Sequence, residues 1–293
     1  MEHYLPSLFH GDAKYYLQSL HAFRAACIKY PEYDQWEETI FQQTVVSKLK
    51  SALDEQGELR VMGVGSGSGE RECKMLIKLL QHFPRINIRA VEPLQEQLVK
   101  YQALTKSKTS DLRGVNFEWR QQTIEEYEKV EEPTKFHFIV AVHSVYYFDN
   151  LEDSLMYLHS ILEPGGVIFI DMKSDDSGLV RYWNHFAPYF HSKYNFITSA
   201  DVRSILDRHG IPYSQHHEWS RVNITSCFDD ASEEGSMVLD FLNHVTRFKE
   251  SAAKDLKQQV LEYLASSACS EKSGDEILLI NDCDTIIISK PLK

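Results

Sequence analysis

Between residues 58 and 172, short apolar runs alternate with longer amphipathic segments, and this alternation restricts the fold more than any other feature. The apolar runs predict strands at 58–64, 86–91, 115–119, 136–142 and 166–172. The segments between them predict helices at 70–82, 95–105 and 151–162. Strands that alternate with helices predict an α/β fold with a parallel sheet and right-handed crossovers. Because runs such as 136–142 are apolar almost throughout, we expect the sheet to be buried on both faces.

The flanking segments predict helices at 12–30, 34–53 and 199–209. Near the end of the chain, 276–280 and 285–289 predict two strands that form a hairpin and close one edge of the sheet. Residues 219–266, with helices near 234–248 and 251–266, exceed what a minimal nucleotide-binding fold needs. We therefore divide the chain into an N-terminal helical part at 1–57, a core at 58–218, an insertion at 219–266 and terminal strands at 267–293.

A glycine-rich turn, Gly65-Ser66-Gly67-Ser68-Gly69, connects the first of these strands to a helix. Such a turn lets a ligand approach the backbone closely and points helix N–H groups at it. A P-loop would require Gly-Lys-Ser/Thr where Glu70-Arg71 stands, and the glycine spacing is not that of a dinucleotide fingerprint. The carboxylate of Glu70 would also repel a pyrophosphate. The remaining interpretation is S-adenosylmethionine, which carries a sulfonium and an ammonium group and no phosphate.

Glu92 supports the same interpretation, because it ends the second strand 23 residues after Gly69. An acidic residue about 20 residues beyond the turn binds ribose hydroxyls in folds of this architecture. The segment from Val142 to Tyr147 follows the fourth strand at the carboxyl edge of the sheet, where open α/β sheets bind ligands.

These motifs resemble those of class I S-adenosylmethionine-dependent methyltransferases, and within that class the chain is similar to the histamine N-methyltransferase family. The resemblance rests on GxGxGE at the turn, Val91-Glu92-Pro93, Tyr146-Tyr147, Leu162-Glu163-Pro164-Gly165-Gly166, Trp183, Ile197-Thr198-Ser199, Asp240-Phe241-Leu242 and Asn281. It implies a Rossmann-like fold with a mostly parallel seven-stranded sheet and a C-terminal hairpin. It also implies that 1–57 acts as a lid over the substrate and that 219–266 lies on the substrate side.

The resemblance implies a site residue by residue. The cofactor would contact Gly65, Gly67, Gly69, Glu70, Glu92, Gln97, Thr123, Ile124 and Val142. The substrate would contact Tyr15, Glu32, His143, Tyr146, Tyr147, Trp183, Phe190, Phe196, Phe241 and Asp282. His143, Tyr146 and Tyr147 would orient the reacting groups. We expect no metal, because the histidines show no metal-ligand spacing.

Two of these assignments have a competing structural interpretation. The family has an asparagine at the position of Asp282, whose carboxylate would bind the substrate ammonium here or would simply be a turn residue. The aromatic residues around Trp183 have helical spacing, which is also typical of core packing. His143 replaces a glutamine, and Lys29 or Tyr30 stands where the family carries a glutamate, so Glu32 would supply that carboxylate.

The composition narrows the class of partner. A net charge of −12 disfavours binding to duplex DNA and to anionic membranes. The chain has no long apolar run and no apolar segment typical of a signal peptide near residue 1, and its five cysteines include no CxxC pair. We therefore expect a cytoplasmic monomer that binds a small amine and neither nucleic acid nor membrane.

The expected reaction is methyl transfer from S-adenosylmethionine to a ring nitrogen of histamine or a closely related biogenic amine, with S-adenosylhomocysteine as product. Two alternatives stay open. One is a methyltransferase for a different imidazole or aromatic amine, and the other is a homologue that binds the cofactor without turnover.

Overall fold

The computed structural model of the chain describes residues 5–8, 12–28, 39–53, 57–189 and 197–292, which fall into two units. Unit 1 consists of the described residues within 1–30, 173–198 and 217–283. Unit 2 consists of those within 31–172, 199–216 and 284–293. No described helix combines the length and the apolar character that crossing a bilayer would require.

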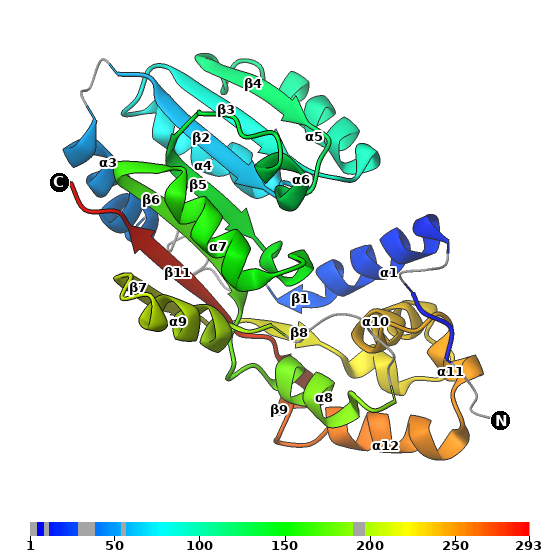
Figure 1. Ribbon diagram of the computed structural model, residues 1–293. Coiled ribbons are helices and arrows are strands. Elements are labelled where there is room, and N and C mark those ends of the chain that lie inside the picture. Colours follow the sequence, from blue (N-terminus) through cyan, green and yellow to red (C-terminus); the bar gives the residue numbers. More distant parts are fainter. Residues whose placement is uncertain (1–4, 9–11, 29–38, 54–56, 190–196, 293) are drawn as a thin grey trace. The chain divides into compact units, whose positions relative to one another are not determined.

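Unit 2 is built on one seven-stranded sheet in the order β4-β3-β2-β5-β6-β11-β7, which can be followed in Figure 1. The strands are β2 (Leu59–Val64), β3 (Ile86–Val91), β4 (Val115–Arg120), β5 (Phe136–Val142), β6 (Leu162–Lys173), β7 (Tyr213–Glu218) and β11 (Cys283–Ser289). All neighbours from β4 to β6 pair in parallel. The predicted class, a Rossmann-like and mostly parallel α/β fold, is confirmed.

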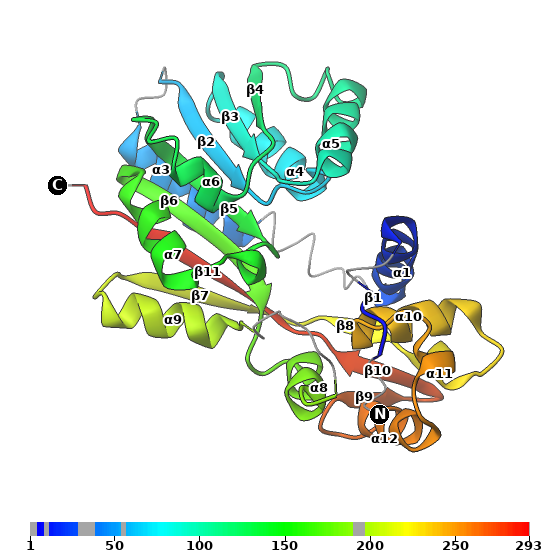
Figure 2. The ribbon, with the colours of Figure 1, turned by 45° about the vertical axis from the view of Figure 1, so that its right-hand side comes forward.

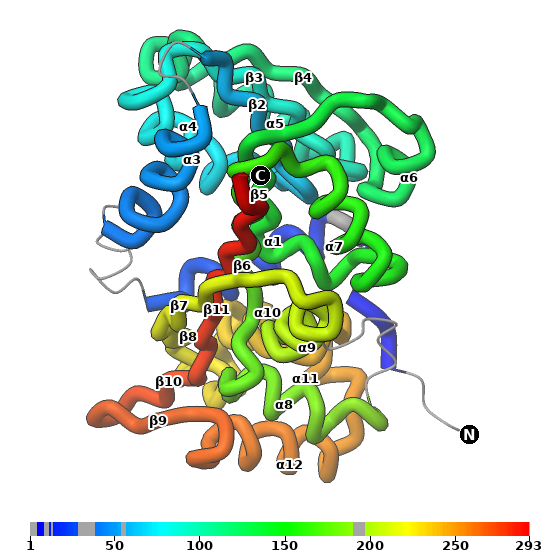
Figure 3. Tube along the Cα trace, turned by 60° about the vertical axis from the view of Figure 1, so that its left-hand side comes forward, coloured from blue at the N-terminus to red at the C-terminus, as the bar shows by residue number. Residues whose placement is uncertain are grey.

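Helices cover both faces of this sheet. Figure 3 shows α3 (Ser47–Ala52) and α4 (Glu70–Leu80) on one side and α6 (Ile124–Glu128), α7 (Leu151–Ser160) and α9 (Ser199–Arg208) on the other. The π-helical turn η1 (Gln42–Val46) precedes α3, and α5 (Gln95–Ser107) packs against α4. The buried faces of η1, α3, α4 and α5 meet strand residues such as Val61, Ile88 and Phe138 in one apolar cluster. Burial on both faces explains why β2 and β5 are nearly continuous apolar runs.

The strand order changes direction between β2 and β5, because β3 and β4 lie on one side of β2 and later strands on the other. The carboxyl ends of β2, β3, β4 and β5 consequently meet at one edge. In such sheets the ligand crevice lies outside this edge, at the point where the order reverses.

The segment Glu163-Pro164-Gly165-Gly166, predicted to end a helix before the next strand, lies inside β6. The register with β5 slips there, since Leu162 pairs with Phe136 and Val167 already pairs with Phe138. Proline is tolerated at such a bulge because it has no N–H to donate. Gly165 N donates to Lys290 O just after β11, and Ser174 N donates to Asp282 O just before β11, so β11 runs antiparallel to β6.

Unit 1 contains an antiparallel sheet in the order β1-β8-β10-β9, with helices around it (Figure 2). Its strands are β1 (Cys27–Ile28), β8 (Arg221–Asn223), β9 (Ser270–Ser273) and β10 (Glu276–Ile280). Its helices are α1 (Ala13–Ala26), α8 (Gly178–Phe186), α10 (Glu233–Asn243), α11 (Phe248–Ser251) and α12 (Lys254–Leu264). Buried residues such as Tyr182, Val222 and Leu239 form the core of this unit.

The predicted pairing of 276–280 with 285–289 is wrong. The terminal hairpin forms instead between β9 and β10, and β11 joins the other sheet between β6 and β7. The intervening residues do not turn the chain because neighbouring backbone holds them, with Asn281 N donating to Ser220 O and Asp282 O accepting from Ser174 N.

Two predicted helices are also shorter than expected. The first ends at Ala26, where Cys27 and Ile28 pair with β8 as a strand. The helix expected at 234–248 ends at Asn243, because His244 adopts a left-handed conformation and a new turn begins at Phe248.

Candidate functional site

The glycine turn after β2 is shaped by backbone conformations that favour glycine. Gly65 has φ +62°, and a Cβ there would lie 2.4 Å from the Cβ of Ser144. Gly67 has φ +55°, and nothing lies within 4 Å of where its Cβ would be. Gly69 caps the N-terminus of α4. At Gly65 the turn therefore packs against the loop that follows β5. At Gly67 the space next to the backbone is open.

Glu92 joins this turn to the end of β3. Its Oε2 accepts a 2.8 Å hydrogen bond from Gly67 N, and its Oε1 accepts a 2.9 Å bond from Leu94 N. Only 5% of Glu92 is exposed. Each carboxylate oxygen can accept more than one hydrogen bond, so both retain acceptor capacity for ligand hydroxyls.

The other cofactor residues expected from the sequence lie in the same unit. Val142 ends β5, and Gln97 lies in the first turn of α5, soon after Glu92. Thr123 begins α6 in a reciprocal capping box with Glu126, and Ile124 next to it is buried. Glu70 is exposed at the start of α4, where a carboxylate also stabilises the helix dipole.

His143, Tyr146 and Tyr147 come together at the end of β5. His143 has φ +50°, an uncommon conformation for a residue with a side chain, and its backbone N–H donates to Asp171 O. Its Nδ1 lies 3.4 Å from the Tyr146 hydroxyl, and the two rings are nearly parallel. Tyr147 is 56% exposed. This cluster presents an aromatic surface, together with an imidazole and a phenol hydroxyl that lie within hydrogen-bond distance of each other.

Sequence reasoning missed two buried polar groups beside the turn, Glu72 and Ser144. Ser144 is 6% exposed and Glu72 is 5% exposed, and Ser144 Oγ and Glu72 Oε2 have no hydrogen-bond partner among the described residues. Burial raises the pKa of Glu72 to about 7. A signal for Glu72 exists in the sequence, because it shares the apolar stripe of α4 with Met75, Leu76 and Leu79.

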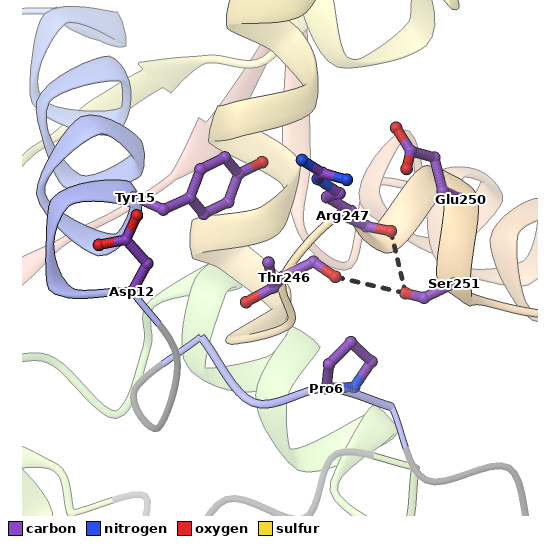
Figure 4. A pocket seen from close by; sticks show the side chains of 7 residues that line it. All are labelled: Pro6, Asp12, Tyr15, Thr246, Arg247, Glu250 and Ser251. Atoms are coloured by element: carbon purple, nitrogen blue, oxygen red, sulfur yellow. Dashed lines mark hydrogen bonds between the residues drawn. The ribbon is translucent and has the colours of Figure 1, made fainter.

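Among the expected substrate residues, Tyr15 and three others lie in unit 1. Tyr15 on α1 lines an open cavity of about 430 Å³, shown in Figure 4 with Pro6, Asp12, Thr246, Arg247, Glu250 and Ser251. The Tyr15 hydroxyl donates to Asp240 Oδ2 at 2.7 Å, and burial is the main reason that its pKa is raised. Its hydroxyl is therefore anchored to Asp240, while the residue lines the cavity.

Trp183 and Phe241 belong to an aromatic group in unit 1. Trp183 Nε1 donates to Leu242 O, and its ring lies 5.2 Å from that of His244. Phe241 lies 4.6 Å from the ring of Phe23. Both side chains pack against the core of unit 1 and stay partly exposed. They therefore contribute to core packing, as their helical spacing also allowed.

Asp282 is engaged within unit 1. Its Oδ1 accepts from Arg221 Nη1 at 2.6 Å and from Ser220 N at 2.8 Å, and Oδ2 lies 3.5 Å from His217 Nε2. Because it is buried and ion-paired with Arg221, which also pairs with Glu271, Asp282 does not present the unpaired carboxylate that an ammonium would seek. Glu32, Phe190 and Phe196 lie outside the described residues.

The residues at the turn fit the cofactor expected there. Glu92 offers acceptors for ribose hydroxyls, Gly67 leaves its backbone uncovered, and Glu72 adds a second carboxylate, which suits a cationic ligand without phosphate.

Known proteins of similar sequence are methyltransferases. A family profile described as a methyltransferase domain matches residues 15–214. The histamine N-methyltransferase of Mus musculus is 31% identical over 86% of this chain and 90% of its own length. That of Danio rerio is 31% identical over 87% of this chain and 89% of its own.

Solved structures share the fold at lower identity. The YcgJ protein of Bacillus subtilis has a TM-score of 0.55 and 13% identity, covering 84% of this chain and 99% of that chain. A putative methyltransferase of Bacillus halodurans has a TM-score of 0.54 and 13% identity, covering 84% and 98%. With a methyltransferase domain over most of its length and these relatives along it, the chain belongs to the histamine N-methyltransferase family.

Proposed function

We propose that the protein transfers the methyl group of S-adenosylmethionine to a ring nitrogen of histamine. The observation that carries the cofactor part is the joined pair of glycine turn and Glu92, held by the bond from Gly67 N to Glu92 Oε2. The observation that carries the acceptor part is the family membership, together with the His143, Tyr146 and Tyr147 cluster at the carboxyl edge of the same sheet.

Bound at the turn, S-adenosylmethionine supplies a methyl group on a sulfonium, which is an excellent leaving group. The main task of the protein is then alignment of donor and acceptor, which brings a large rate advantage without a nucleophilic residue. Glu92 would hold the ribose, and the glycine turn together with Gln97, Thr123, Ile124 and Val142 would hold the rest of the cofactor. Tyr146 and Tyr147 hold a flat acceptor ring by aromatic contact.

The imidazole ring is the acceptor that this arrangement suits. A neutral ring nitrogen has a free lone pair and needs no base before attack, whereas a protonated alkylamine must first lose a proton. His143 orients the ring through its own nitrogen, and the surplus proton leaves after transfer.

The change at Asp282 favours a second candidate, methylation of a different imidazole or aromatic amine. Its carboxylate is paired with Arg221, so it adds no free charge for an ammonium. The third candidate, a homologue that binds the cofactor without turnover, predicts binding and no product. We further propose that the protein works as a monomer in the cytoplasm, in keeping with five free cysteines.

The test is product analysis by mass spectrometry after incubation with S-adenosylmethionine and a panel of amines headed by histamine. We expect one methyl group on the histamine ring. Product from another amine alone would establish the second candidate, and cofactor binding without product from any amine would establish the third.

The variant Tyr146→Phe keeps the aromatic ring and removes the hydroxyl that contacts His143. We expect it to have a reduced kcat.

A further inference from the structure

Glu72 is an ionisable residue at an apolar position, and the mechanism proposed above does not use it. It lies in the first turn of α4, directly after the glycine turn, and its side chain faces the sheet rather than solvent. A Cβ on Gly63 would lie 2.4 Å from Glu72 Oε1 and 2.4 Å from Ser66 Oγ. The carboxylate therefore fills the space that the missing side chain of Gly63 leaves under the turn.

The groups around Glu72 do not neutralise it. Tyr101 of α5 and Ser66 of the turn face the carboxylate and lower its pKa, yet neither hydroxyl makes a hydrogen bond of good geometry with a described residue. Cys73 on α4 and Glu92 at the end of β3 are the other titratable groups that face it, and the charge of Glu92 raises its pKa. Burial is the largest cause of the raised pKa, and no cation is among these groups.

We propose that Glu72 links cofactor binding to a proton: its carboxyl group is protonated while the turn is vacant and ionises when a cationic group of S-adenosylmethionine lies over the turn. This inference rests on the cofactor assigned above. The released proton passes to solvent, and no covalent bond changes. The ionised carboxylate then acts as a positioning residue that stabilises the positive charge of the ligand through the turn.

The direction of the pH dependence follows from this linkage. A cation near the carboxylate favours its ionised form, so ligand binding lowers the pKa of Glu72 below its vacant value of about 7. Affinity therefore rises with pH between about 5 and 8 and then levels off. Because some of the ligand-free molecules hold the proton at pH 7, binding releases a fraction of a proton per ligand at this pH.

Calorimetric titration in two buffers of different ionisation enthalpy measures that proton release. S-adenosylmethionine and S-adenosylhomocysteine are the two probes, because they differ by the methyl group that makes the sulfur cationic. Release with both identifies the ammonium as the coupled cation, and release with S-adenosylmethionine alone identifies the sulfonium. Either result supports the linkage.

The matched variants are Glu72→Gln and Glu58→Gln. Glu58 is exposed just before the amino end of β2 and keeps Glu72 intact, so we expect its variant to release the same proton as the wild type. Glu72→Gln should release none, and its Kd should be flat between pH 5 and 8. A difference infrared spectrum of the wild type should lose a protonated carboxyl band on binding, which keeps the test independent of whether the variant folds.

Two results would overturn the inference. Binding of either probe with no proton release by the wild type refutes the linkage and leaves the cofactor assignment standing. Failure of the wild type to bind either probe refutes both together.

Discussion

Among single residues, Gly65 shows most clearly how this sequence builds a ligand site. Its φ of +62° requires glycine, and Ser144 occupies the space that a side chain would need. Gly210 provides a comparison, because its φ is also +62° and nothing lies within 4 Å of its missing Cβ. A side chain at either position would have the same cost from the left-handed backbone conformation. Only at Gly65 would it also clash with a neighbouring residue.

We predict that Gly210→Ala lowers the free energy of unfolding by about 1 kcal/mol, the cost of the backbone conformation alone. Gly65→Ala should cost more than that and weaken the binding of S-adenosylhomocysteine at least tenfold. Chemical denaturation and calorimetry measure the two effects. Adding Ser144→Gly to Gly65→Ala should recover part of the loss, and equal costs at the two glycines would contradict the assigned contact.

Glu72 also has a consequence for stability. Its pKa in the folded protein is about 7 against an ordinary value of 4.5, so the folded state binds more protons between these pH values. This contribution to stability is fully present below pH 4.5 and is lost as the pH rises through about 7. Glu72→Gln should therefore stabilise the cofactor-free protein at pH 8 by on the order of 1–3 kcal/mol relative to its effect at pH 5. A gain in Tm that is the same at both pH values would contradict this.

At the scale of elements, one buried carboxylate connects α1, α10 and α11 in unit 1. Asp240 accepts hydrogen bonds from the Tyr15 hydroxyl, Arg247 N and Phe248 N, and it is completely buried. Asp240→Ala leaves all three donors without this acceptor. We expect a loss of about 2–4 kcal/mol in the free energy of unfolding, measured by urea denaturation.

The matched control is Tyr15→Phe, which removes one of these three bonds and should cost about 1 kcal/mol. If it costs as much as Asp240→Ala, the two backbone bonds to Asp240 contribute little and the anchoring of α11 has another cause.

Element types were predictable wherever the sequence pattern decides burial. The strands at 86–91 and 136–142 have the same bounds in the structure as in the prediction, because the apolar residues that mark them are buried, all of them in 86–91 and all but Val142 in 136–142. The strand β9, Ser270–Ser273, was missed because its exposed residues carry no apolar pattern and it exists through pairing with β10. The hairpin partner was wrong because contacts to Ser220, distant in sequence, fix the residues between β10 and β11.

Residues of the candidate site also differ in whether the sequence alone predicts them. Gly65 and Glu92 were predictable because turn conformation and spacing are local properties. The pairing of Asp282 with Arg221 was not, because the two residues are 61 positions apart. The sequence places Glu72 among the apolar residues of α4. The structure was needed to show that its carboxylate is buried beside the turn.

At the scale of the whole molecule, the net charge of −12 should attract a cationic substrate. At about pH 9 histamine still carries its ammonium, whereas the imidazole of 4-methylimidazole is neutral, so the two compounds differ in charge. We predict that kcat/KM for histamine falls roughly two- to fivefold between ~20 mM and ~300 mM salt, since salt screens this attraction. The value for 4-methylimidazole should stay constant, and an equal fall for both compounds would contradict a role for the charge.

The central claim is that the glycine turn and Glu92 form the cofactor site. A crystal structure of the protein with S-adenosylhomocysteine tests it most directly. We predict that the ribose hydroxyls donate to Glu92 and that the ligand lies over the backbone of Gly67. A ribose bound to other residues, with Glu92 still bonded only to Gly67 N and Leu94 N, would contradict the account.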